Sequence, residues 1–153
     1  MGQTPKALPA TVHASAIQVE GRGVLVRGQS GSGKSSLVLA LLIAGRDDCR
    51  LIADDRVVLA AEAGRLFASP PEPLAGLIEV RGQGILRQPY LSSAEIGLVV
   101  DLQPVELCSR LPSAAAAEIE IEGVRLRRMA LPIGQADGWV RVLAAIRFPA
   151  VPV

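Results

Sequence analysis

The segment 28–35, GQSGSGKS, has the residue types and spacing of a phosphate-binding loop, G-x-x-x-x-G-K-[ST]. Its glycines allow the backbone to wrap closely around an anion, with several N–H groups directed at it. A lysine at this place reaches the β- and γ-phosphates of a nucleotide, and the serine after it is a Mg²⁺ ligand. We therefore predict a nucleotide site formed by Gly28, Ser30, Gly31, Ser32, Gly33, Lys34, Ser35 and Ser36.

The flanking residues predict the strand and the helix that such a loop requires. Residues 23–27 (GVLVR) are typical of a short strand, and residues 35–44 (SSLVLALLIA) of a strongly apolar helix. Gly45 stands where a C-cap glycine would end that helix. The alternative is an ordinary Gly/Ser turn with a solvated lysine, and the order strand, loop, helix argues against it.

Two acidic segments could complete the site. Asp54 and Asp55 end the short apolar strand predicted over 50–53, and Asp101 lies within the apolar run 96–102, at the spacing of an ordinary NTPase acidic strand. Adjacent carboxylates can divide two tasks, metal binding and proton transfer, although such pairs also cap turns. We favour Asp54 and Asp55, and expect Asp101 to be a strand-end charge that faces solvent.

The remaining patterns predict an α/β domain with a mixed sheet. A strand over 11–19 is followed by a turn so short that it must pair antiparallel with the strand before the loop. Hairpins are expected over 57–69 and 119–129, a strand over 77–81, a central strand over 96–102 and a helix over 139–147. Residues 1–10 are expected to be a flexible lead, 11–148 one domain and 149–153 a tail.

Composition bounds the class of protein. The 153 residues suffice for one domain with a real core, and half of them are hydrophobic although few are aromatic. A net charge of +1 gives no sign of a nucleic-acid surface. Cys49 and Cys108 lack zinc-ligand spacing, and no segment has the length of a membrane span or the pattern of a signal peptide. These features predict a cytoplasmic protein with free thiols and no membrane partner.

Four motifs together resemble the catalytic domain of the HPr kinase/phosphorylase family. That family has a histidine on a strand before the hairpin, a GxSGxGKS loop, an R-L-(V/I)-A-D-D segment and an E-(I/V)-R-G-x-G-I segment. The corresponding residues here are His13, 28–35, 50–55 (RLIADD) and 79–85 (EVRGQGI), in the same order and over about half of the chain. A weaker match, within 108–111 (CSRL), places a later family arginine at Arg110.

The resemblance implies a kinase that uses ATP and Mg²⁺ to phosphorylate a serine of the phosphocarrier protein HPr, and the reverse removal of that phosphate with inorganic phosphate. It implies a fold similar to the nucleotide-binding core of phosphoenolpyruvate carboxykinase, and a homo-oligomer, a hexamer in longer members. Lys34 would hold phosphate, Asp54 would take the serine proton, and Ser35 with Asp55 would bind Mg²⁺. Glu79 would be a second metal contact, and phosphate contacts would come from Arg81 and His13.

The chain also departs from the family. Members often carry an acidic residue directly after the loop serine, where this chain has Ser36. We also expect a short form, without the N-terminal domain of longer members. Two alternatives stay open: a small-molecule P-loop kinase, and a nucleotide-binding regulatory module without transfer activity. A small-molecule kinase would need an arginine-rich lid, for which the only candidate is the cluster at Arg125, Arg127 and Arg128, whose alternation suggests a strand.

Overall fold

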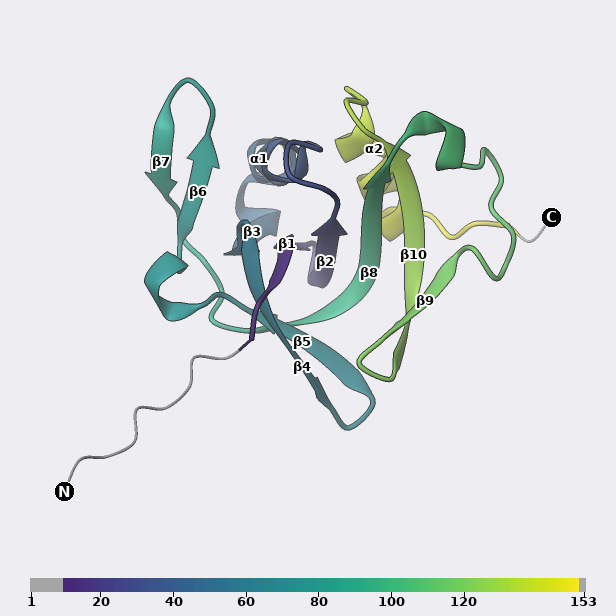
Figure 1. Cartoon of the computed structure of the whole chain (residues 1–153), viewed down its shortest axis with the longest axis horizontal. Helices are drawn as coiled ribbons and strands as arrows, with labels where there is room; N and C mark the ends of the chain where they lie inside the picture. The colour runs from purple at the N-terminus through teal and green to yellow at the C-terminus, as the bar shows by residue number, and fades with distance from the viewer. Residues whose placement is uncertain (1–9, 152–153) are drawn as a thin grey trace.

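The computed structural model describes residues 10–151 as ten β-strands and two α-helices (Figure 1). The expected lead falls almost wholly outside these residues, and the expected tail partly so. The helices are α1 (Lys34–Gly45) and α2 (Gly138–Arg147). The strands are β1 (Val12–Val19), β2 (Arg22–Arg27), β3 (Cys49–Ala53), β4 (Arg56–Glu62), β5 (Arg65–Ser69), β6 (Leu77–Val80), β7 (Gly84–Arg87), β8 (Ala94–Gln103), β9 (Glu118–Ile121) and β10 (Val124–Pro132).

The main sheet is mixed, as the sequence predicted. β1 pairs antiparallel with β2, and β2 and β10 both run parallel to β8, which is a central strand. The pairings β1–β2, β2–β8, β8–β5, β5–β4 and β4–β1 form a closed ring of five strands. Beyond the ring, β3 pairs with β1, and β9 extends the sheet from β10. The predicted hairpins at β1–β2, β4–β5 and β9–β10 are all confirmed.

Two hydrophobic cores lie on opposite faces of the sheet. Along β2, Val24 and Val26 pack toward the helices with Leu37, while Leu25 between them packs into the second core inside the ring. The alternation follows from the two-residue period of a strand. On α2, Val142 is buried in the helix-side core, so the apolar face of this helix packs on its own domain. No helix within residues 10–151 is long and apolar enough to cross a membrane.

The end of α1 differs from the prediction. Gly45 is the last helical residue and has ordinary negative dihedral angles, and the left-handed residue that follows is Arg46, with φ of 48°. Gly45 is needed for a different reason. A Cβ atom here would lie 2.0 Å from the Sγ atom of Cys49, so only glycine lets the chain turn back this closely into β3.

A small hairpin, β6–β7, forms a separate two-stranded sheet beside α1 (Figure 1). β6 was predicted, but β7 was not. Leu86 of β7 packs against the helix-side core, which anchors the hairpin near the start of α1. The hairpin therefore places Arg81, which follows β6, beside the phosphate-binding loop.

Candidate active site

The loop between β2 and α1 has the backbone that phosphate binding requires. Gly31 and Gly33 have φ of 81° and 99°, values that side chains other than glycine rarely adopt. The Lys34 ammonium lies over the loop and donates to the carbonyl oxygens of Gly28, at 2.8 Å, and Gln29, at 3.0 Å. Burial lowers the pKa of Lys34, and the nearby Asp55 and Asp54 carboxylates oppose that shift. These two hydrogen bonds hold the loop in shape. They also place the ammonium where it can bind a phosphate in the loop.

Asp54 joins the loop to the sheet. Asp54 is buried, with 6% of the residue exposed. Its Oδ1 atom accepts hydrogen bonds from the hydroxyls of Ser35, at 2.7 Å, and Ser15, at 2.8 Å. Its Oδ2 atom accepts one from the backbone N–H of Glu79, at 3.3 Å. One carboxylate thus connects α1, β1 and β6, which makes it a fixed structural centre of the site.

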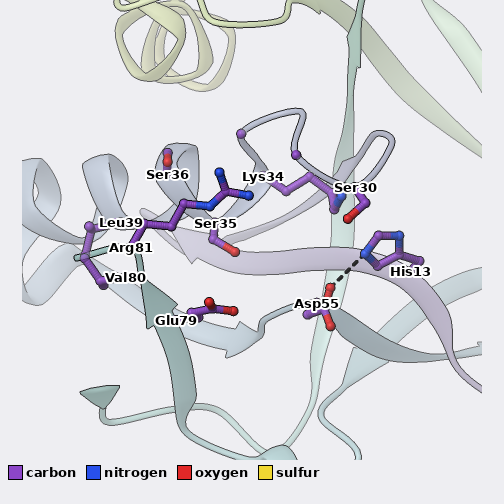
Figure 2. Close-up of a pocket in the computed structure, with 12 residues that line it drawn as sticks. His13, Ser30, Lys34, Ser35, Ser36, Leu39, Asp55, Glu79, Val80 and Arg81 are labelled. Carbon is purple, nitrogen blue, oxygen red and sulfur yellow. Dashed lines mark hydrogen bonds and ion pairs between the residues drawn. The ribbon is translucent and has the colours of Figure 1, made fainter. Parts of the chain in front are cut away.

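Asp55 has the opposite environment. It adopts a left-handed backbone with φ of 68°, and its side chain is 63% exposed and lines the pocket in front of the loop. Its Oδ1 atom lies 2.7 Å from the Nε2 atom of His13 on β1 (Figure 2). The turn that separates Asp54 from Asp55 therefore directs one carboxylate inward to Ser35 and the other outward to the histidine.

Ser15 is a candidate site residue that our sequence reasoning missed. Its fully buried hydroxyl donates to Asp54 and accepts the backbone N–H of Asp55, at 3.2 Å. It therefore fixes both aspartates. A signal was present: on a strand, Ser15 shares a face with His13 and Ile17, and a serine in such an otherwise buried row is unusual.

The pocket in front of the loop has a volume of about 310 Å³ and gathers charges of both signs. Glu79 and Arg81 enter it from the β6–β7 hairpin (Figure 2). No ion pair joins Glu79 to Arg81 in the part of the chain that the structure describes. Of the predicted site residues, the pocket is lined by His13, Ser30, Gly31, Gly33, Lys34, Ser35, Ser36, Asp55, Glu79 and Arg81.

Asp101 corrects one expectation. Its side chain is 10% exposed and is not a solvent-facing charge. It lies on the face of the sheet away from α1 and accepts hydrogen bonds from Arg27, at 2.7 and 2.8 Å, and from Arg128, at 2.5 Å. Burial raises the pKa of Asp101, but these hydrogen bonds and charges outweigh burial and leave the pKa below its usual range. Both oxygens are occupied by arginines, so Asp101 ties β2, β8 and β10 together outside the pocket.

Arg110 is also apart from the site. It is exposed in the segment between β8 and β9, and it does not line the pocket. Figure 1 shows this segment on the far side of β10 from the β6–β7 hairpin. The arginine cluster on β10 is no lid, because Arg128 holds Asp101, Arg127 donates to the carbonyl of Ala145, and Arg125 lies 3.9 Å from Glu118.

The donor set fits a nucleotide with Mg²⁺. Serine hydroxyl and carboxylate oxygens are the ligands that this ion prefers, and it is bound in kinases by one or two carboxylates together with substrate phosphates. Within residues 10–151 no three His, Cys, Asp or Glu side chains form a complete metal cage. Ser35 and Asp54, in contact with one another at the start of α1, offer the partial ligand set expected for an ion that arrives with phosphate.

Comparisons with known proteins agree with this geometry. The family model described as HPr Serine kinase C-terminal domain matches residues 6–146. HPr kinase/phosphorylase of Streptococcus thermophilus is 37% identical over 135 residues, which cover 80% of this chain and 42% of that protein. HPr kinase/phosphorylase of Clostridium tetani is 34% identical over 138 residues, which cover 84% of this chain and 44% of that protein. The chain therefore spans less than half the length of these relatives.

The fold also matches a solved structure. The HPr(Ser) kinase/phosphatase from Coxiella burnetii has a TM-score of 0.74 and 25% sequence identity, with coverage of 90% of this chain and 94% of that one. The mixed α/β architecture described above is thus shared with that protein over nearly all of both chains.

Proposed function

The chain belongs to the HPr serine kinase C-terminal domain family, and from that membership we propose that it transfers the γ-phosphate of ATP to a serine of an HPr-type phosphocarrier protein. One observation carries the proposal. Ser35 and Lys34 of the loop and the exposed pair of Asp55 and His13 line a single pocket, and the buried Asp54 is bonded to Ser35 behind it. This is a phosphate cradle with a metal-binding side and a proton-accepting side.

The binding half of the reaction follows from the loop. Its backbone N–H groups and the start of α1 favour the phosphate chain, and Lys34 and Arg81 neutralise its charge. Ser35 and Asp54 would hold Mg²⁺, which would supply positive charge against the charge that develops on the phosphates. Positioning and electrostatic stabilisation supply most of the acceleration in phosphoryl transfer, and these rigidly held groups can provide both.

The contacts of the two aspartates favour roles opposite to those predicted from the sequence. Asp54 is buried against the Ser35 hydroxyl, which suits a carboxylate that positions the ion. Asp55 is exposed in the pocket, where a serine of a protein substrate can reach it. We propose that Asp55 accepts the proton as the serine oxygen bonds to the γ-phosphorus and the bond to the β-phosphate oxygen breaks. His13 orients the Asp55 carboxylate, and Glu79, which lines the same pocket from the hairpin, would be a further ligand for the ion.

The reverse reaction uses the same groups. Inorganic phosphate attacks the phosphoserine, the protonated Asp55 returns its proton to the departing serine oxygen, and pyrophosphate forms. This direction brings two anions together, so it depends more on the metal and on cationic groups. Ser36 is uncharged and does not help to hold the ion. We therefore propose that the forward reaction is faster than the reverse reaction in this chain.

Several wider properties belong to the proposal. Support for a likeness to the nucleotide-binding core of phosphoenolpyruvate carboxykinase comes from the strand, loop and helix on a mixed sheet. We further propose a cytoplasmic location and a homo-oligomer, for which Phe148, 68% exposed, offers an apolar contact. Sedimentation that shows only monomer at high concentration would contradict the oligomer.

The test is incubation of the protein with γ-labelled ATP, Mg²⁺ and HPr from the same organism. We expect label in HPr and none without Mg²⁺. ATP binding without any labelled acceptor would instead favour a regulatory module. Label in a small molecule, with HPr untouched, would favour a small-molecule kinase.

A further inference from the structure

Asp54 and Asp55 fill the short gap between β3 and β4. Both strands pair antiparallel with β1, and they have the same register at either side of the gap. Ala53 before the gap and Val57 after it are buried in the core inside the ring. Because alternate residues of a strand share a face, a regular strand through the gap would direct Asp55 into that core with them. It would place the two aspartates on opposite faces of the sheet.

A turn at Asp55 prevents that burial. The backbone N–H of Arg56 donates to the carbonyl oxygen of Asp54, at 2.8 Å, and Asp55 between them has φ of 68°. A three-residue turn with positive φ is rare and strained, and such strain persists only where the surrounding contacts hold it. The turn directs the Asp55 side chain to the pocket in front of the loop, where it contacts His13 (Figure 2).

The hydroxyl of Ser15 holds this turn from the neighbouring strand β1. Ser15 is fully buried, and its hydroxyl accepts the backbone N–H of Asp55, at 3.2 Å, and donates to the Oδ1 atom of Asp54, at 2.8 Å. A hydroxyl has one proton to donate, and an ionised carboxylate only accepts. The proton therefore goes to the Asp54 carboxylate, while an oxygen lone pair fixes the backbone of Asp55. One side chain thus holds both halves of the turn.

The position of Ser15 favours this specific role over that of an ordinary buried residue. Ile17 and Val19 continue the same face of β1 and are buried in the helix-side core. An apolar residue at position 15 would extend that row, whereas a buried hydroxyl costs stability unless it is hydrogen-bonded. Within residues 10–151, the hydrogen bonds of the Ser15 hydroxyl go to the two aspartates.

We propose that Ser15 is a positioning residue for phosphoryl transfer, and that its hydroxyl sets the turn that directs Asp54 to the metal side of the site and Asp55 to the open pocket. The inference rests on the proposed function, in which the first aspartate binds Mg²⁺ and the second accepts the proton. Without the hydroxyl the strained turn relaxes, and both carboxylates lose their directions together. Ser15 does not line the pocket and acts through the two aspartates.

Ser15→Thr and Ser15→Val form a matched pair, because the two side chains are close in size and differ in the hydroxyl. We expect Ser15→Val, and the smaller Ser15→Ala, to lower kcat for HPr phosphorylation and to raise the Mg²⁺ concentration for half-maximal activity, each by about tenfold or more. Ser15→Thr should restore most of both. If Ser15→Val does not fold, Ser15→Ala against Ser15→Thr makes the same comparison.

Ile17→Val is the control for a change that is only structural. Ile17 is fully buried on the same face of β1 and does not line the pocket. This variant should lose stability in urea and keep the kcat and the Mg²⁺ requirement of the wild type. Equal kcat and Mg²⁺ requirement in Ser15→Thr and Ser15→Val would overturn the inference, and so would Ser15 variants that behave like Ile17→Val.

His13 gives a readout that does not need activity, because it is the only histidine in the chain. In protein without a histidine tag, its imidazole NMR signals report the contact with Asp55. We expect Ser15→Ala to shift these signals and Ser15→Thr to leave them as in the wild type. If the wild type does not label HPr but the signals follow the hydroxyl, the proposed function fails and the role of Ser15 in the turn stands. Unchanged signals in Ser15→Ala would overturn that role, whether or not HPr is labelled.

Discussion

The Ser35 hydroxyl donates a hydrogen bond of 2.7 Å to the Oδ1 atom of Asp54, so the first turn of α1 and the end of β3 share one carboxylate. The same oxygen accepts the hydroxyl of Ser15 on β1. A bound Mg²⁺ would meet a serine and an aspartate that are already in position. This contact is the basis for the division of roles between the two adjacent aspartates.

Asp54→Asn should raise the Mg²⁺ concentration needed for half-maximal activity, because the amide keeps the shape but loses the negative charge that attracts the ion. We expect an increase of about tenfold or more, in line with the loss of a charged metal contact. The measurement is a Mg²⁺ titration of the kinase rate at saturating ATP. An unchanged Mg²⁺ requirement would contradict the metal-side role of Asp54.

Asp55→Asn should lower kcat by about 10²- to 10⁴-fold, the usual contribution of a general base, while ATP affinity stays within a few fold. The reason is that Asp55 contacts His13 and the open pocket but not the loop. Steady-state kinetics and calorimetry with ATP separate the two effects. If Asp54→Asn abolishes transfer at any Mg²⁺ concentration and Asp55→Asn only raises the Mg²⁺ requirement, the roles predicted from the sequence are correct and ours are reversed.

Asp101→Asn should destabilise the fold without any direct effect on catalysis. The change leaves Arg27 and Arg128 without their shared carboxylate, and we expect a loss of about 2 kcal/mol, less than for a fully buried pair because Arg27 is one-third exposed. Urea unfolding at pH 7 measures the loss. Glu62→Gln, at an exposed strand end, is the control and should change stability by less than about 0.5 kcal/mol.

The pH dependence of this effect has a definite sign. Because the pKa of Asp101 is lowered in the folded protein, its contribution is fully present above the unfolded value of about 4 and is lost as the pH falls through the folded value. The stability difference between the wild type and Asp101→Asn should therefore shrink below about pH 4. A difference that stays constant from pH 7 to pH 3 would show that the carboxylate charge is not the cause.

Ser36→Glu should raise the rate of the reverse reaction relative to the forward one. Ser36 lines the pocket next to Ser35, where an added carboxylate can help to hold the ion between two anions. The assay supplies serine-phosphorylated HPr, Mg²⁺ and inorganic phosphate, and follows pyrophosphate release. A wild-type reverse rate equal to the forward rate would contradict the idea, and an unchanged ratio in the variant would show that another residue already holds the ion.

Much of the fold could be predicted from the sequence because its signals are local. The glycine loop, the apolar helix after it and the hairpin turns each depend on residues close together in the chain. β7 was missed because the segment 84–87 is short and mostly exposed. It is a strand because it pairs with β6 and because Leu86 packs against the core. The C-cap prediction was wrong because glycine is needed at position 45 to avoid a clash with the side chain of Cys49. That contact forms only when the chain is folded.

The site was predicted in composition but not in arrangement. The motifs identified most of the residues that line the pocket, yet the adjacency of Asp54 and Asp55 could not tell which of the two faces inward. Asp101 was misjudged because its partners, Arg27 and Arg128, are 74 and 27 residues away in the sequence. Patterns of neighbouring residues do not predict contacts between residues so far apart in the sequence.

The most direct test of the central claim is to find which residue of HPr carries the phosphate after incubation with this protein, ATP and Mg²⁺. We predict one acid-stable phosphoserine, mapped by mass spectrometry. It should be absent with Lys34→Met, which keeps the aliphatic stem but removes the ammonium from the loop. Unmodified HPr in the presence of bound ATP, or equal phosphorylation by the wild type and Lys34→Met, would contradict the account.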